Sequence, residues 1–184
     1  MITTYTGRTV DPLHIKPEDV CIEDIAHALA LCNRFAGHTR VPLSVAQHSV
    51  DVSRYCAGPF ALQGLLHDAS EAYLGDVTKW LKDTPEFAAY RKAEALVQQT
   101  IFQAFGCPTL LSETVINADR FMVRFEARQL MHRLDVPAHK RLEYPPMGPR
   151  EASAIEHWQP WGWKTAEEIF LDEFWTLYSS KQEA

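Results

Sequence analysis

The chain has no long hydrophobic run and no excess of basic residues, and these two absences exclude several classes of protein. None of its segments approaches the ~18 consecutive apolar residues of a membrane-spanning helix, so we expect no membrane association. Lysine and arginine together number 18 against 24 aspartates and glutamates, which gives a net charge of -6. A protein that binds duplex nucleic acid needs a basic face, so we expect no such partner.

Cysteine and glycine are also scarce. The four cysteines form no C-x-x-C pair, and a chain of 184 residues needs no disulfide to hold its core together. The eight glycines form neither a P-loop nor a glycine-rich dinucleotide-binding turn. The first residues lack the charged and apolar regions of a secretory signal. These features favour a cytoplasmic protein with reduced thiols.

Apolar residues recur at helical spacing along most of the chain, which predicts one mostly α-helical domain spanning residues 1–184. Residues 1–20 are rich in turn formers and favour a short hairpin or an irregular arm. Prolines concentrate in residues 135–162 and predict an irregular segment there. Helices are expected over about 22–35, 44–57, 60–74, 85–105, 112–133 and 165–179. The fold class is therefore an all-α bundle of about six helices.

Local signals mark where some of these helices begin. Ser44 and Gln47 have the spacing of a capping box, in which the serine caps the helix and the glutamine reaches back to the cap. Thr165 and Glu168 have the same spacing. Pro85 follows Thr84 and suits the first position of a helix, where its missing N–H group costs nothing.

Side chains that bind divalent cations lie inside several of these apolar segments. His67 and Asp68 are adjacent in the helix expected over 60–74, and His48 and Asp119 lie in two other expected helices. Burying four such groups without partners costs several kcal/mol, whereas a metal ion would satisfy them. Two imidazoles and two carboxylates suit Mn, Fe, Co, Ni, Zn or Mg. Helical bundles hold metals in this way, with inward-facing ligands on separate helices.

Glu71 lies one helical turn after His67 and Asp68 in the sequence. Residues three and four positions apart share one face of a helix, so we expect Glu71 beside the metal ligands. A carboxylate in that position could accept a proton from an attacking water or donate one to a leaving oxygen.

The order His48, His67-Asp68 and Asp119 resembles the ligand signature of the HD-domain metal-dependent phosphohydrolases. The segments around Arg34, Ser44–Ser49 and His67–Asp76 resemble small bacterial and phage members related to the 5'-deoxynucleotidases. They are also similar to phage dATP triphosphohydrolases. The resemblance covers about residues 22–130 and implies an HD-domain helical bundle.

The resemblance also implies a role for individual residues. His48, His67, Asp68 and Asp119 would bind a divalent metal ion, with Glu71 and Asp68 as catalytic residues. Substrate would be bound by Arg34 at the phosphate or sugar, Asp76 at a sugar hydroxyl, Lys82 at the phosphate, Phe35 by stacking, and Gly37, His38 and Lys79 nearby.

Two positions depart from the patterns of these relatives. Phe35 falls where several relatives carry tryptophan, so stacking is kept but an indole N–H donor is lost. Gly37 falls where the relatives that act on dATP carry a bulky aliphatic residue. Strict selectivity for adenine is therefore not expected.

The sequence leaves three functions open. The first is release of phosphate from deoxynucleoside 5'-monophosphates. The second is release of triphosphate from deoxynucleoside triphosphates, for which Lys79, Lys82, Arg91 and Lys92 could supply extra positive charge. The third is a nucleotide-binding regulator without turnover. Members of the family are commonly dimers or larger, so we expect a homo-oligomer, with the tryptophan-rich C-terminal part as a plausible contact.

Three of the assigned side chains also have plainer explanations. Glu71 could be a solvated surface acid, Lys82 an ordinary exposed lysine, and Arg34 a surface partner of Glu23 or Asp24. All three explanations predict a side chain at the protein surface.

Overall fold

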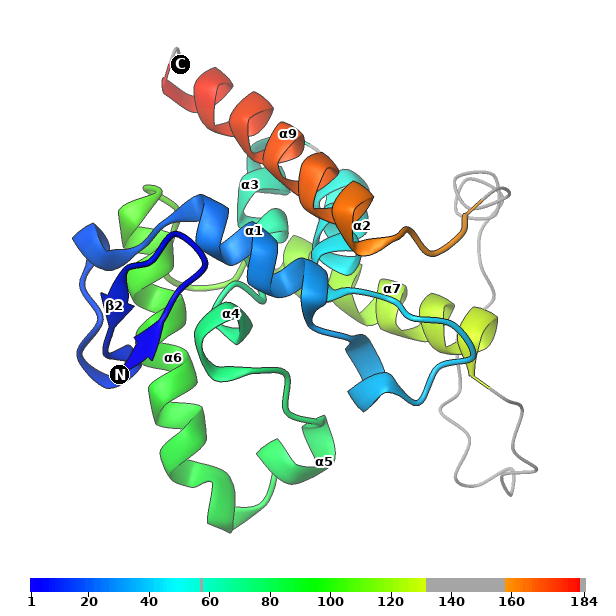
Figure 1. The fold of residues 1–184 in the computed structure, drawn as a ribbon. Coiled ribbons are helices and arrows are strands. Elements are labelled where there is room, and N and C mark those ends of the chain that lie inside the picture. Colours follow the sequence, from blue (N-terminus) through cyan, green and yellow to red (C-terminus); the bar gives the residue numbers. More distant parts are fainter. Residues whose placement is uncertain (57, 132–157, 183–184) are drawn as a thin grey trace.

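Helices make up most of the chain that the structure, a computed structural model, describes, namely residues 1–56, 58–131 and 158–182. The α-helices of these residues are α1 (Ile22–Leu31), α2 (Val45–Cys56), α3 (Ala61–Leu65), α4 (Glu71–Leu74), α5 (Lys79–Lys82), α6 (Ala88–Ala104), α7 (Glu113–Leu130) and α9 (Trp163–Gln182). Short 3₁₀ turns lie between several of them, including one at Arg34–Gly37. Figure 1 shows the arrangement, with the N-terminal hairpin at one side of the bundle.

The N-terminal hairpin pairs β1 (Ile2–Thr3) with β2 (Thr9–Val10) in antiparallel register. The prediction of a mostly helical protein with a short N-terminal hairpin is therefore confirmed. No helix within the described residues is long and apolar enough to cross a membrane.

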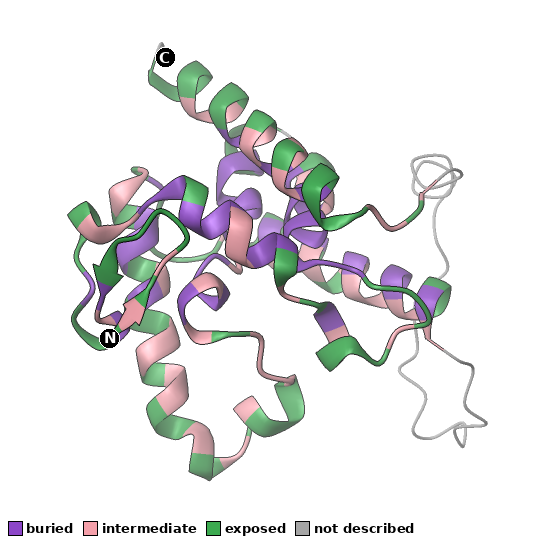
Figure 2. Cartoon of the chain, in the orientation of Figure 1, coloured by how far each residue is buried: buried purple, intermediate pink, exposed green. Residues whose placement is uncertain are grey.

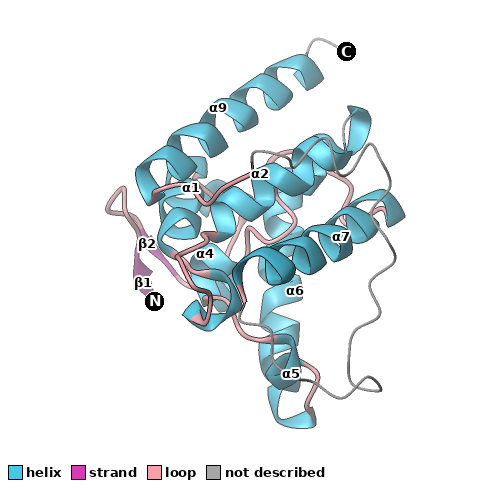
Figure 3. Ribbon diagram, turned by 90° about the vertical axis from the view of Figure 1, so that its right-hand side faces the viewer, coloured by secondary structure: helices cyan, strands magenta, loops and turns pink. Residues whose placement is uncertain are grey.

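Helix α2 lies at the centre of the bundle and packs against α1, α3, α7 and α9. Buried residues of α1, α2 and α3 meet in the interior of the bundle, where residues of α6 and α9 join them (Figure 2). Helix α9 lies across α1, α2 and α3 and buries Phe170 and Phe174 completely. Figure 3 shows α2 and α7 side by side, where Val52 and Val115 belong to a second, smaller apolar cluster.

A glycine allows α2 and α3 to approach closely. A Cβ atom added at Gly64 would lie 3.2 Å from the Cα of Ser53 and 3.2 Å from the sulfur of Cys56. These distances are shorter than ordinary carbon contacts, and close packing transmits such crowding to the backbone. The absence of a side chain at Gly64 lets α3 approach α2. The residues that follow α3 are thereby brought close to His48 on α2.

Several predicted boundaries need correction. The helix expected over 22–35 ends at Leu31, and a separate 3₁₀ turn contains Arg34 and Phe35. The helix expected over 60–74 is broken into α3 and α4, and the single turn α5 was not predicted. The helix expected to reach 133 ends at Leu130, because the backbone of Met131 is extended. The irregular segment expected over 135–162 lies mostly outside the described residues.

Only half of the first capping box forms. The Oγ of Ser44 accepts the backbone N–H of Gln47, as expected. The Gln47 side chain turns away and bonds with the carbonyl of Gln159 and the N–H of Trp161, because burial in the core leaves its amide dependent on protein partners. The second box is wrong, since α9 begins at Trp163 and Thr165 lies within it.

Candidate metal centre

His67 and Asp68 lie in a turn between α3 and α4, not on a continuous helix. In an unbroken helix the N–H of Ser70 would bond to the carbonyl of Leu66. The side-chain amide of Gln98, from α6, forms hydrogen bonds with both groups instead. Its oxygen accepts the Ser70 N–H at 3.0 Å, and its nitrogen donates to the Leu66 carbonyl at 2.7 Å. Gln98 therefore accounts for the break that shapes this turn.

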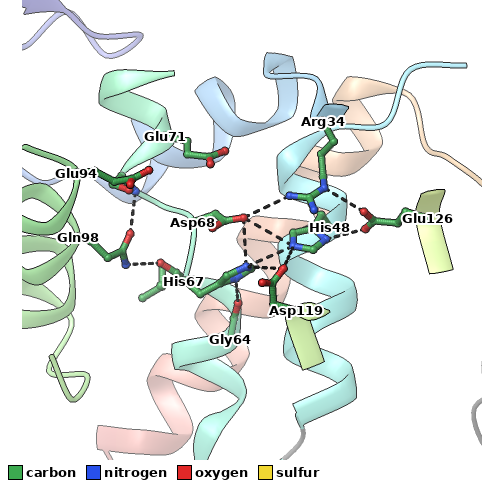
Figure 4. A network of polar contacts seen from close by, with 12 residues as sticks. Arg34, His48, Gly64, His67, Asp68, Glu71, Glu94, Gln98, Asp119 and Glu126 are labelled. Atoms are coloured by element: carbon green, nitrogen blue, oxygen red, sulfur yellow. Dashed lines mark hydrogen bonds and ion pairs between the residues drawn. The ribbon is translucent and has the colours of Figure 1, made fainter. Parts of the chain in front are cut away.

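Four side chains from three parts of the chain converge beside this turn (Figure 4). His48, His67 and Asp68 offer ligand atoms that lie within 4.8 Å of one another. An oxygen of Asp119, from α7, lies 3.2 Å from the Nε2 of His48 and 3.8 Å from the Nε2 of His67. The structure thus brings together all four residues that the sequence predicts as metal ligands, and the first three form a group that could hold a metal ion.

The other nitrogen of each imidazole is already bonded. His48 Nδ1 lies 2.7 Å from a carboxylate oxygen of Glu126, and His67 Nδ1 lies 2.8 Å from the carbonyl of Gly64. Both partners only accept, so each neutral ring carries its proton on Nδ1 and leaves Nε2 as an acceptor. The two Nε2 atoms lie 3.3 Å apart. When both rings are neutral, their Nε2 lone pairs face each other and the nearby carboxylates, an arrangement of ligand atoms that fits a divalent cation.

The pKa shifts within the group also indicate that it favours positive charge. Burial lowers the pKa of His67, but the carboxylates of Asp68 and Asp119 raise it well above its usual value. Burial raises the pKa of Asp119, yet hydrogen bonds to His48 and His67 hold it well below its ordinary range. Both histidines are buried, whereas the Asp119 side chain is 36% exposed. The group is thus accessible from the side of its carboxylates.

Glu126 is a functional candidate that the sequence reasoning missed. It is fully buried on α7 and accepts hydrogen bonds from His48 and from the Nε of Arg34, the latter at 3.0 Å. A second nitrogen of Arg34 lies 3.4 Å from Asp68. The explanation of Arg34 as a partner of Asp24 is wrong, because Asp24 accepts from Thr6 instead. The seven-residue spacing from Asp119 places Glu126 on the same helical face and was the available signal.

Glu71 is the first residue of α4 and is buried, so it is not a solvated acid. Its Oε1 lies 3.4 Å from the Nζ of Lys82, and its Oε2 has no hydrogen-bond partner among the described residues. Burial, followed by the charges of Asp68 and Asp76, raises the pKa of Glu71 to about 8. Glu71 therefore keeps a proton near neutral pH.

Lys82 is not an ordinary exposed lysine. Its side chain is 21% exposed, and its ammonium group lies between the carboxylates of Glu71 and Glu94. Burial lowers the pKa of Lys82, but the hydrogen bond to Glu94 and the charge of Glu71 raise it above its ordinary value. The lysine thus stays charged at the edge of the candidate metal centre.

The remaining predicted substrate residues differ in position. Asp76 is half-buried, and its burial raises its pKa. Phe35 is half-buried, with the guanidinium carbon of Arg34 5.6 Å from its ring centre. Gly37 and His38 are exposed, and Lys79 is exposed with Asp83 as its ion-pair partner. Within the described residues, no hydrogen bond or ion pair links Gly37, His38 or Lys79 to the metal group.

The backbone around Phe35 is strained. Phe35 and Ala36 have φ angles of 55° and 50°, and Gly37 follows at 75°. Non-glycine residues in this region cost of order 1–3 kcal/mol each and often occur at functional sites. The strain lies directly beside Arg34, which contacts the candidate metal centre.

Comparison with known proteins shows a family. No protein-family model matches the chain. The chain is 36% identical over 129 residues to the uncharacterized protein YfdR of Escherichia coli, a match covering 70% of this chain and 71% of YfdR. It is 35% identical over 142 residues to an uncharacterized protein of Rhodobacter capsulatus, covering 68% of this chain and 70% of that protein. The chain therefore belongs to the same family as YfdR, and neither relative's name states an activity.

The role of Gln98 can be tested with Gln98→Leu. The substitution removes the Gln98 hydrogen bonds to the Leu66 carbonyl and the Ser70 N–H, while the Leu66 carbonyl keeps the N–H of Ala69. The Ser70 N–H therefore loses its side-chain partner, or the turn closes into a helix. We expect the free energy of unfolding to fall by about 1–3 kcal/mol, and the affinity for Mn²⁺ to fall as well. Urea denaturation and calorimetric titration measure the two effects. Gln103→Leu, an exposed position on the same helix, is the control. Equal Mn²⁺ affinity in both variants would contradict the assigned role.

The buried carboxyl of Glu71 predicts a pH-dependent stability. Between about pH 4.5 and pH 8 the unfolded chain loses the Glu71 proton while the folded, metal-free protein keeps it, so folding stability falls as pH rises. Glu71→Gln abolishes this loss. The variant should match the wild-type midpoint of thermal unfolding at pH 5 and exceed it at pH 8. Glu168→Gln, at an exposed position of α9, should show no such trend. A Glu71→Gln difference that is independent of pH would refute the burial argument.

Proposed function

We propose that this protein is a divalent-metal-dependent phosphohydrolase that releases phosphate from deoxynucleoside 5'-monophosphates. The observation that carries the proposal is the convergence of the acceptor atoms of His48, His67, Asp68 and Asp119 at one buried point. The resemblance of these residues and their flanking segments to HD-domain phosphohydrolases supports the same reading. Mn, Co, Zn, Fe, Ni and Mg all suit this mixed nitrogen and oxygen donor set.

The residues around the proposed ligands would each have a different role in the reaction. A bound ion would lower the pKa of a water molecule and neutralise charge that develops on the phosphate. The unpartnered Oε2 of Glu71 is available to exchange a proton with the attacking water or the leaving oxygen. Arg34 lies beside Asp68 and Lys82 lies beside Glu71, and these two cations would bind the phosphate oxygens. Water can attack phosphorus directly, so no protein nucleophile is required.

The distribution of charge favours a monophosphate over a triphosphate. Arg34 and Lys82, the cations beside the metal group in the described part of the chain, already pair with carboxylates. Of the extra cations expected for a triphosphate, Lys79 faces Asp83 on the surface and Lys92 is exposed. Arg91 donates to the backbone carbonyls of Lys82 and Thr84. The site thus has positive charge for one phosphate group.

The sugar and base have fewer candidate partners. Phe35 supplies an aromatic ring beside Arg34 and would stack on the base, while Asp76 would accept a hydrogen bond from a sugar hydroxyl. Gly37 and His38 lie at the exposed end of the same turn and leave room for any base. A homo-oligomer stays a prediction, with Trp163 and Trp175 about half exposed on α9 as candidate contacts.

A product assay tests the proposed function. Protein freed of metal is supplied with Mn²⁺, Co²⁺ or Mg²⁺ and with each deoxynucleoside monophosphate, each triphosphate and the ribonucleotide forms. We expect metal-dependent orthophosphate from the deoxynucleoside monophosphates and at least a 100-fold lower rate with Glu71→Gln.

The other outcomes of this assay are equally informative. Release of triphosphate from deoxynucleoside triphosphates would identify a triphosphohydrolase and overturn the charge argument. No product from any nucleotide, combined with metal-dependent nucleotide binding, would identify a regulator. His67→Ala is the control for activity from contaminating phosphatases, because it removes one of the converging acceptors.

A further inference from the structure

Glu126 joins two residues that the proposed reaction uses for different purposes. One oxygen accepts the Nδ1–H of His48 at 2.7 Å, and the other accepts the Nε–H of Arg34 at 3.0 Å. The carboxylate has no exposed surface. Figure 4 shows it between the arginine and the imidazole, on the side away from Asp119. Glu126 is thus positioned to act on both without touching the substrate.

The two imidazoles differ in what holds them. His67 donates to a neutral backbone carbonyl, that of Gly64, whereas His48 donates to the charged carboxylate of Glu126. A carboxylate behind a metal-binding histidine fixes its tautomer and orientation and makes its free nitrogen a stronger ligand. Glu126 therefore makes His48 the more strongly donating of the two rings.

The same carboxylate determines where Arg34 points. Arg34 is buried, and the backbone beside it is strained, so its guanidinium depends on its partners for a fixed direction. Its Nε bonds to Glu126 and one terminal nitrogen reaches Asp68, which leaves further N–H donors of the five-donor guanidinium for a ligand. Without Glu126, the guanidinium of Arg34 would be free to turn and pair more fully with Asp68.

Stability is a weak explanation for this arrangement. A buried ion pair costs desolvation energy that its attraction only partly repays, and an apolar pair of similar volume is often as stable. A second arginine–glutamate pair among the described residues, Arg54 on α2 with Glu173 on α9, has the same 3.0 Å distance but lies near the surface. That pair offers a matched comparison for Glu126.

We propose that Glu126 is a positioning residue that couples metal binding to phosphate binding, by orienting His48 through one oxygen and Arg34 through the other. The proposal rests on the proposed function for its substrate half, and on the candidate metal centre alone for its metal half. Replacing the carboxylate should therefore weaken both metal binding, through His48, and phosphate binding, through Arg34.

The test compares Glu126→Gln with Glu173→Gln in the full chain. The amide of Glu126→Gln can accept from only one of its two partners and presents an N–H₂ donor to the other. Titration of metal-free protein with Co²⁺, followed by visible absorption, should show a dissociation constant 10–100-fold higher than wild type and a changed cobalt spectrum. The Michaelis constant for a deoxynucleoside monophosphate at saturating metal should rise as well. Glu173→Gln should match wild type in all three measurements.

Each outcome of these measurements tests one part of the proposal. If Glu126→Gln lowers thermal stability but keeps the wild-type cobalt affinity and spectrum, the residue is merely structural and the proposal is overturned. If cobalt affinity falls but the Michaelis constant does not change, the coupling to Arg34 is wrong. If wild type binds cobalt but hydrolyses no nucleotide, the proposed function fails, while the cobalt titration still decides the metal half. Glu126→Asp, which keeps the charge but is too short to reach both partners, gives the same readout should the glutamine variant not fold.

Discussion

The convergence of imidazole nitrogens and carboxylate oxygens at one point inside a helical bundle is the constraint on which the rest of this structure depends. The free nitrogens of His48 and His67 lie 3.3 Å apart, and each also faces a carboxylate oxygen of Asp119. Such acceptors repel one another unless a cation or protons lie between them, and burial strengthens the repulsion. The helical bundle must therefore hold these nitrogen and oxygen atoms close together.

Three features of the scaffold supply that geometry. Gly64 lets α3 approach α2, which brings the turn after α3 close to His48. Gln98 replaces a helical hydrogen bond between Leu66 and Ser70 and so holds that turn open. Glu126 holds His48 from behind through α7. The unpartnered oxygen of Glu71 and the strained backbone at Phe35 add costs that folding alone does not explain. Local rules are usually broken in this way at functional sites.

Much of this centre could be predicted from the sequence, because its ligands interrupt apolar patterns. His48, His67, Asp68 and Asp119 each lie in an apolar context, and the structure brings them together from separate segments. The mostly helical fold followed from the same periodicity. Glu71 lies near Asp68 (Figure 4), although the helix expected to hold both residues is broken into α3 and α4.

The parts that sequence did not predict depend on contacts between distant residues. The break at residues 66–70 depends on Gln98, which comes from a different helix and looks like any polar residue of α6. Glu126 looks like a solvated glutamate until Arg34 and His48 are seen on either side of it. Lys79 and Lys82 share one helical turn, but only the folded position of α5 shows that Lys82 faces Glu71 and Lys79 faces solvent.

The most direct test of this account is the anomalous diffraction of crystals soaked in Mn²⁺ or Co²⁺, measured at the absorption edge of the metal. We expect an anomalous peak in contact with the Nε2 atoms of His48 and His67 and with oxygens of Asp68 and Asp119. A peak elsewhere, or none at these residues in crystals that hold the metal at other sites, would contradict it.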